Sequence, residues 1–328
     1  MTAGSASEPP EQPVPGLLSR RLLFVTGKGG VGKTTIAAAL AKLSASLGRR
    51  TLLCEVDARG DVATCLGSGP SGYRPAEVAS SLWVMSMDTE AALRDYIRLF
   101  VRVPLAARLG PVASALDFIS TAAPGVTEIL VMGKVCWEVR EGGWDVVVVD
   151  APASGHVVSQ LASPTSMGEL VGVGMIRQQT DWMVEMLSDT RRTGAVVVTT
   201  PDEMAVQETL ELVGRIGSET VVPVASVVAN RVLPELFGRG EEEVFGSLSE
   251  TGPASRLSGA LGSDVAPLFD AARLAVQLRR SSVSHLSRLR TGLPGSLAPL
   301  NVPNVFVSDR PSCVTDDVST ALAAELGI

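Results

Sequence analysis

Residues 27–35 concentrate the residue types that bind phosphate. They read Gly-Lys-Gly-Gly-Val-Gly-Lys-Thr-Thr and directly follow the apolar run Leu22–Val25. Glycines let backbone N–H groups approach an anion closely, a lysine neutralises phosphate charge, and a hydroxyl residue ligates Mg²⁺. The spacing therefore predicts a phosphate-binding loop, the P-loop, between a strand and a helix.

The side chains of this loop divide the work between phosphate and metal. Lys33 is predicted to neutralise the β- and γ-phosphates, Thr34 to ligate Mg²⁺ through its hydroxyl, and Thr35 to lie near the α-phosphate. Backbone groups supply the other contacts, so the predicted nucleotide-binding residues are Gly27, Lys28, Gly29, Gly30, Val31, Gly32, Lys33, Thr34 and Thr35. An ordinary P-loop has no need of Lys28.

Two aspartates end apolar runs elsewhere in the chain. Asp150 follows Val146–Val149, and at the end of a buried strand it can hold a Mg²⁺-bound water. Asp57 ends the run that begins at Thr51, where a carboxylate can orient or deprotonate the attacking water. A helix or turn cap is the alternative role for Asp57, and Asp61 is a second candidate in the same area.

The elements that must position these residues are short buried strands separated by helical stretches. Continuous apolar runs of this kind favour a parallel sheet covered on both faces. The predicted fold is α/β, a doubly wound, mostly parallel sheet with ligands at the carboxyl ends of its strands. The predicted strands are Leu22–Val25, Thr51–Val56, Leu82–Met85, Val146–Val149, Val196–Thr199, Val224–Ala229 and Val305–Val307.

The chain reads as one domain with helical additions. Residues 1–19, rich in Pro, Ser and Glu, are predicted to be a flexible tail. Residues 20–328 form the predicted P-loop domain. Within it, about 88–141, 163–192 and 237–300 fit the strand–helix alternation poorly and are predicted to be helical additions.

Composition excludes several other classes of protein. The 328 residues carry a net charge of −7, which argues against broad nucleic-acid binding, so no nucleic-acid partner is expected. No apolar run approaches the roughly 18 residues that a membrane span needs. The four cysteines form no C-x-x-C pair, and without an export signal they are expected to be reduced thiols of a cytoplasmic protein.

Lys28 and several downstream segments give the chain a family resemblance. A lysine at the second loop position resembles the deviant-Walker P-loop ATPases. Asp150–His156 resembles the switch II segment of the branch that contains the arsenite-pump ATPase and the guided-entry ATPase for tail-anchored proteins. Residues 124–128, Pro-Gly-Val-Thr-Glu, and the Thr-Thr-Pro-Asp-Glu segment from Thr199 are similar to further segments of that branch. The resemblance spans about residues 21–235.

Membership of this branch implies roles for particular residues and a dimer that hydrolyses ATP with Mg²⁺. Lys28 would reach across the dimer to the partner's nucleotide, and Asp57 would be the switch I aspartate. Gly155 and His156 would belong to a switch II that reports the γ-phosphate, although His156 fits equally well as a residue that holds its loop. Asn230 would read the adenine through its amide. The partner would be a second copy or a paralogous ATPase.

The chain departs from the branch in ways that bear on its client. Residues 57–60 read Asp-Ala-Arg-Gly where the guided-entry branch usually has Asp-Pro-Ala-His, and the cysteine pair that joins guided-entry dimers through zinc is missing. Ser163–Arg192 carries four methionines, which suit binding of a hydrophobic helical client but also ordinary helix packing. The five late arginines allow at most peripheral membrane contact: Arg273, Arg279, Arg280, Arg288 and Arg290.

Three functions are compatible with these features. The favoured one is a dimeric ATP-hydrolysing switch that couples Mg-ATP-driven closure to a helical client or partner surface. The second is a nucleotide-binding scaffold with little hydrolysis, working as a heterodimer with a paralogue. The third is a ParA/MinD-like ATPase that positions cargo.

Overall fold

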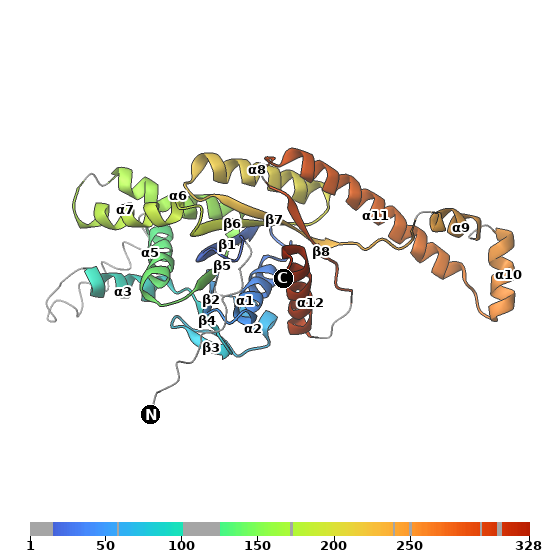
Figure 1. The fold of residues 1–328 in the computed structure, drawn as a ribbon, viewed down its shortest axis with the longest axis horizontal. Helices are drawn as coiled ribbons and strands as arrows, with labels where there is room; N and C mark the ends of the chain where they lie inside the picture. Colours follow the sequence, from blue (N-terminus) through green and yellow to red (C-terminus); the bar gives the residue numbers. More distant parts are fainter. Residues whose placement is uncertain are drawn as a thin grey trace, which may run out of the picture.

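A single eight-stranded sheet runs through the molecule (Figure 1). The computed structural model describes residues 16–57, 59–100, 125–170, 173–238, 240–248, 251–295, 297–306 and 310–328. The strand order is β3-β4-β2-β5-β1-β6-β7-β8, and every neighbouring pair is parallel except β3 with β4. The strands are β1 (Leu22–Gly27), β2 (Thr51–Glu55), β3 (Ala76–Ala79), β4 (Leu82–Ser86), β5 (Val146–Ala153), β6 (Thr193–Thr199), β7 (Val224–Val232) and β8 (Pro299–Pro303).

Helices cover both faces of this sheet. Side chains alternate along β1, so Leu23 and Val25 pack in one cluster with α1, α2 and α12, and Leu22 and Phe24 pack in another with α5, α6, α7 and α8. The prediction of a mostly parallel α/β sheet is confirmed. The helices are α1 (Lys33–Ser46), α2 (Asp61–Leu66), α3 (Thr89–Phe100), α5 (Val126–Glu141), α6 (Ser154–Leu170), α7 (Met175–Ser188), α8 (Glu203–Glu219), α9 (Glu241–Leu248), α10 (Thr251–Leu261), α11 (Ala266–Gly292) and α12 (Pro311–Leu326).

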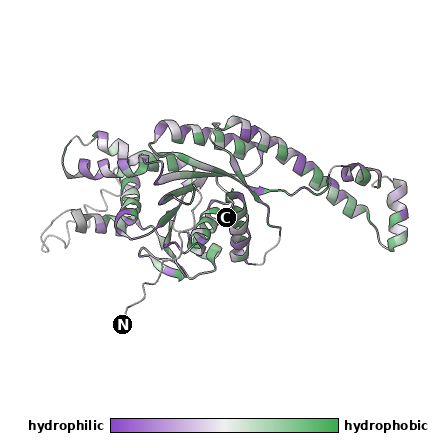
Figure 2. Ribbon diagram, viewed as in Figure 1, coloured by the Kyte–Doolittle hydropathy of each residue, from purple (hydrophilic) through white to green (hydrophobic). Residues whose placement is uncertain are grey.

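The inner strands of the sheet are largely apolar (Figure 2). All six residues of β1 and all seven of β6 are buried. Because both faces of the sheet are covered, these strands carry apolar side chains in continuous runs and not at alternate positions, and threonine occupies only a few of their buried positions. Among the described residues, no helix is long and apolar enough to cross a membrane.

The final strand lies earlier in the chain than predicted. The prediction of a strand at Val305–Val307 was wrong: β8 spans Pro299–Pro303, Val305 follows it outside the sheet, and residue 307 lies outside the described residues. Two prolines make this segment a poor strand by sequence. An edge strand tolerates proline because only one side of it must pair, and β8 pairs only with β7.

A long helix carries an arm away from the sheet. α11 has 27 residues, about 40 Å at 1.5 Å per residue. Its carboxyl-terminal part is anchored, because Leu289 is fully buried in the core cluster. Its amino-terminal part projects away with α9 and α10 (Figure 1).

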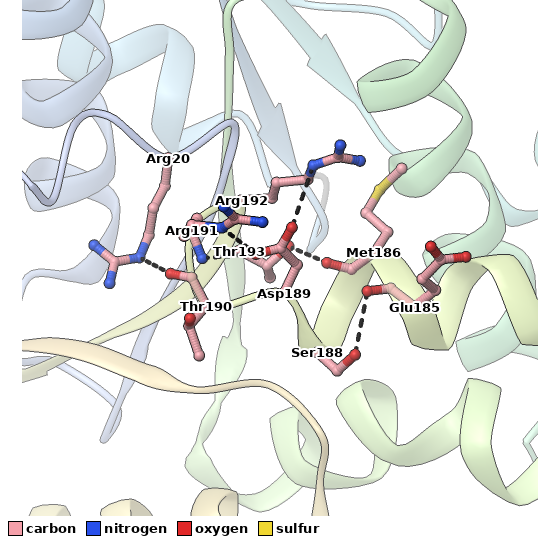
Figure 3. A network of polar contacts seen from close by, with 9 residues as sticks. All are labelled: Arg20, Glu185, Met186, Ser188, Asp189, Thr190, Arg191, Arg192 and Thr193. Atoms are coloured by element: carbon pink, nitrogen blue, oxygen red, sulfur yellow. Dashed lines mark hydrogen bonds and ion pairs between the residues drawn. The ribbon is translucent and has the colours of Figure 1, made fainter.

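The turn between α7 and β6 ties the start of β6 to the start of β1 (Figure 3). The Asp189 carboxylate accepts a hydrogen bond from the backbone N–H of Arg191 at 2.9 Å and pairs with the Arg192 guanidinium at 3.3 Å, interactions that lower the pKa of Asp189. The Arg192 carbonyl accepts the backbone N–H of Leu22 at 2.9 Å. This network holds the amino ends of the strands, opposite the P-loop.

Gly27, at the end of β1, offers a test of how tightly the sheet fixes the start of the P-loop. A Cβ at Gly27 would lie 2.1 Å from the Val198 carbonyl oxygen of β6, at a φ of 151°. We predict that Gly27→Ala destabilises the fold by about 3 kcal/mol or more, because backbone must move to admit the methyl group. Urea unfolding measures this. Gly29→Ala is the matched control, since its Cβ would meet nothing within 4 Å, and an equal loss in both variants would contradict the prediction.

Candidate nucleotide site

The P-loop connects β1 to the amino end of α1. Gly30 and Gly32 have φ values of 84° and 94°, a region that residues with a Cβ rarely occupy. At Gly32 a Cβ would also lie 2.4 Å from Nδ2 of Asn230. The first N–H groups of α1 have no partner within the helix, so the loop presents them to an anion.

Two loop side chains turn toward the centre of the site. Thr34 donates a hydrogen bond from Oγ1 to Oδ2 of Asp150 at 2.8 Å. Lys33 donates from Nζ to the Lys28 carbonyl at 3.2 Å. Burial lowers the pKa of Lys33, while the charges of Asp150 and Asp57 oppose this shift. The structure thus brings both predicted aspartates near the predicted phosphate lysine.

Asp150 is a buried carboxylate with one free oxygen. It lies on β5 between β1 and β2, it is 8% exposed, and no described residue bonds its Oδ1. Burial raises the pKa of Asp150 to about 6, although Thr34 and Lys33 pull it down. A buried carboxylate beside a hydroxyl, with an unpartnered oxygen, suits Mg²⁺ held through the Thr34 hydroxyl and a water on Asp150.

The loop after β2 carries Asp57 at the same edge of the sheet. Asp57 is exposed, and residue 58 lies outside the described residues. The charge of Arg59 lowers the pKa of Lys33, which places this cation close to the P-loop as well. Asp61 is the first residue of α2, and its backbone N–H, not its carboxylate, makes the bond that fixes this turn, to Oε1 of Glu55 at 2.9 Å. Glu55 belongs to no motif of the sequence and was not predicted. Its position at the end of a strand is the only sequence feature that could have suggested it.

Asn230 holds the P-loop from the other side. It is 5% exposed at the carboxyl end of β7, and its Nδ2 donates to the Val31 carbonyl at 2.8 Å. Its Oδ1 accepts from the backbone N–H of Arg231 at 3.0 Å, and Arg231 has a φ of 59°. Both atoms of the amide therefore bond the protein itself here. Reading of an adenine by Asn230 remains a prediction.

The remaining predicted residues surround this centre. Gly155 and His156 lie exposed in the first turn of α6, just after β5. Thr35 directs its Oγ1 to the Cys65 sulfur at 3.9 Å, and burial raises the pKa of the Cys65 thiol.

Lys28 is held by a carboxylate of its own chain. Its Nζ lies 2.7 Å from Oε1 of Glu208 on α8, and both side chains are about one third exposed, at 29% and 36%. The ion pair directs the Lys28 side chain toward α8. Because both side chains are partly exposed, the pair can break without exposing the hydrophobic core.

Fold and site together define the class. A parallel sheet with a P-loop after β1, a buried aspartate bonded to the P-loop threonine, and a second lysine in the loop are the parts of a P-loop ATPase. The family model described as "Anion-transporting ATPase" matches residues 20–186, about half of the chain. The chain therefore belongs to the anion-transporting ATPase family, as the resemblance implied.

Curated relatives carry ATPase names. The chain is similar to ATPase BagA of Mycobacterium tuberculosis, with 33% identity over 225 residues that cover 65% of this chain and 66% of the relative. It is also similar to ATPase GET3 of Podospora anserina, with 26% identity over 161 residues, 49% of this chain and 48% of the relative. The match thus spans just under two thirds of the first protein and about half of the second.

The free oxygen of Asp150 should cost stability when no nucleotide is bound. A carboxyl whose pKa rises on folding, from 3.8 to about 6, binds its proton more tightly in the folded state. Its contribution is favourable below about pH 4 and is lost as pH rises to about 6, by roughly 3 kcal/mol. We predict that Asp150→Asn is more stable than the wild type at pH 7 and that the difference shrinks toward pH 4.

Urea unfolding of both proteins without nucleotide, at pH 4, 5, 6 and 7, measures this difference. Adding Mg-ADP at pH 7 should stabilise the wild type far more than the variant, because the metal needs the carboxylate. A variant less stable than the wild type at pH 7 would contradict the burial argument.

The Lys28–Glu208 pair should restrain turnover. Lys28 must leave Glu208 before it can contact a phosphate, so the free energy of the ion pair opposes turnover. Partly exposed ion pairs contribute up to about 1 kcal/mol. Glu208→Gln should therefore change stability little and raise the ATP hydrolysis rate by up to about fivefold. The control is Glu211→Gln on the same helix, where the carboxylate bonds Gln207 and not Lys28. A steady-state phosphate-release assay gives the answer, and an unchanged or reduced rate in Glu208→Gln would show that the pair does not restrain Lys28.

Proposed function

We propose that this chain is an ATP-hydrolysing switch that works as a dimer. The observation that carries the proposal is the Asp150 carboxylate, with one oxygen on the Thr34 hydroxyl and the other unpartnered in a buried position beside the P-loop. A purely structural aspartate would have both oxygens satisfied.

Hydrolysis transfers the γ-phosphoryl group of ATP to water and yields ADP and phosphate. Bound Mg²⁺ supplies neutralisation of phosphate charge. Lys33 and the N–H groups at the start of α1 bind the phosphates, and the Asp57 carboxylate orients the attacking water by accepting a hydrogen bond from it. Asp57 needs no metal contact for this role, and its place on an exposed loop beside Lys33 agrees with it.

The proposed dimer assigns a role to Lys28. In the single chain the Lys28 ammonium is paired with Glu208 on α8, whereas the Lys33 ammonium bonds the Lys28 carbonyl within the P-loop. In the proposed dimer Lys28 leaves Glu208 and contacts the phosphates bound by the partner. The partner is a second copy of this chain or a paralogous ATPase.

A continuous helix leads from the site to an apolar tip. α6 begins at the predicted switch II residues and ends at Leu170, which is 81% exposed, and Val173 beyond it is 86% exposed. We propose that a shift of the first turn of α6 is transmitted along this helix to its carboxyl end. The exposed side chains of Leu170 and Val173 there would contact a helical client or partner.

The methionines contribute less to such a surface than their number suggested. Met183 and Met186 are 5% and 8% exposed, and both pack in the core cluster with Leu187. At these two positions ordinary helix packing accounts for the methionines. The side chain of Met175 lies outside the described residues.

A second candidate function is a nucleotide-binding scaffold with little hydrolysis. The departure at residues 57–60, where Gly60 stands in the place of the histidine of the Asp-Pro-Ala-His segment, favours it. Turnover that does not change in Asp57→Asn would support the scaffold, and a loss of turnover would support the switch.

The two loop lysines should fail in different ways. We predict that Lys28→Ala and Lys33→Ala both abolish ATP turnover, but that Lys28→Ala largely retains ADP binding because the phosphates are held by Lys33 and the loop backbone. Calorimetric titration with Mg-ADP measures the binding. An equal loss of binding in both variants would refute a role for Lys28 on the partner's nucleotide.

A mixing experiment tests the same role in a homodimer. Lys28→Ala and Asp57→Asn are each predicted to be inactive. In a mixed dimer, the site of the Lys28→Ala chain keeps its own Asp57 and receives Lys28 from the other chain. Equal mixing should restore about a quarter of wild-type turnover, since half of the dimers are mixed and each has one complete site. If the homodimer forms but mixing restores nothing, Lys28 acts within its own chain.

A further inference from the structure

Glu55 is a fully engaged carboxylate at the edge of the site. It is 2% exposed at the end of β2 and lies opposite Asp150 in the β2–β5 register. Its Oε2 accepts a hydrogen bond from Ser86 Oγ at 2.8 Å. Its Oε1 accepts from the backbone N–H groups of Asp61 at 2.9 Å and Val62 at 3.3 Å.

These hydrogen bonds tie the start of α2 to the end of β2. The side chain of Glu55 reaches forward to the start of α2, so the loop from Val56 to Gly60 is held at both of its ends by one residue. Asp57 lies inside that loop. Gly60, with a φ of 80°, makes the turn that brings the N–H groups of α2 back to the carboxylate.

The sheet holds Glu55 itself in place. The Met87 N–H donates to the Glu55 carbonyl at 2.7 Å, and the Val56 N–H donates to the Asp150 carbonyl at 3.2 Å. Because Ser86 donates its hydroxyl hydrogen to Glu55, it accepts a hydrogen bond from the Ser71 hydroxyl at 2.5 Å. Glu55 is therefore fixed by β4 and β5 on either side, and a side chain fixed in this way can fix the loop that it bonds.

We propose that Glu55 is a positioning residue that clamps the start of α2 to the end of β2, so that Asp57, two residues after Glu55, meets the attacking water. This inference rests on the proposed hydrolysis by Asp57. The clamp acts on the loop and not on the phosphates, which the P-loop binds on the other side of Asp150. Loss of the clamp should therefore lower kcat and leave nucleotide affinity nearly unchanged.

Glu55→Ala and Glu55→Gln separate the hydrogen bonds from the size and charge of the residue. Glutamine keeps a carbonyl for the N–H groups of Asp61 and Val62, and its amide can donate to Ser86. We expect Glu55→Ala to reduce kcat by about ten- to a hundredfold, with KM and the Kd for Mg-ADP within about twofold of wild type. Glu55→Gln should recover most of the loss. Ser86→Ala, which removes only the Oε2 partner, should have a smaller effect.

Amide hydrogen exchange, measured on the same variants by NMR, reads the clamp without any turnover. The amides of Asp61 and Val62 should exchange about tenfold faster in Glu55→Ala and close to the wild-type rate in Glu55→Gln. The clamp would be overturned if these exchange rates were unchanged in Glu55→Ala, or if they rose as much in Glu55→Gln as in Glu55→Ala. A fall in Mg-ADP affinity as large as the fall in kcat would overturn the positioning role. If the wild type does not hydrolyse ATP, the proposed function fails while the exchange still decides whether Glu55 holds the loop.

Discussion

The hydrogen bond from Thr34 to Asp150 joins the first turn of α1 to the strand at the middle of the sheet. It places a carboxylate in a position with little solvent, where its charge is unfavourable and its pKa rises to about 6. In the proposed function, Mg²⁺ held by the Thr34 hydroxyl and a water on Asp150 offsets that cost, and the cost remains while no cation is bound. Binding of Mg-nucleotide would then be coupled to stability where the P-loop, β5 and the following helix α6 meet.

Parallel strand order brings the other groups to the same edge. β2, β5 and β1 are neighbours, so Glu55 lies beside Asp150, and Asp150 beside Val25 just before the P-loop. Each strand leads into a different segment of the site: β1 into the P-loop, β2 into the loop with Asp57, and β5 into the first turn of α6. In the proposed switch, a change in the phosphates would act on these three segments through groups that are adjacent in one sheet.

Much of this arrangement could be predicted from the sequence, because the P-loop spacing and the buried strands are local patterns. Glu55 could not, since its partners at Ser86 and Asp61 depend on the pairing of β2 with β4 and on the turn at Gly60. The last strand was misplaced because proline at an edge obeys different rules from proline inside a sheet. The methionines of α7 showed the composition of a binding surface, and only packing placed Met183 and Met186 in the core.

The central claim is that nucleotide closes two copies of this fold around Lys28. The most direct measurement is the mass of the Asp57→Asn variant by light scattering, first with Mg-ATP and then with Mg-ADP, at the same protein concentration. We expect a dimer with Mg-ATP and a monomer with Mg-ADP, because in our proposal Lys28 of the second copy contacts the γ-phosphate, the one phosphate that ADP lacks. A monomer in both conditions would contradict a homodimeric switch.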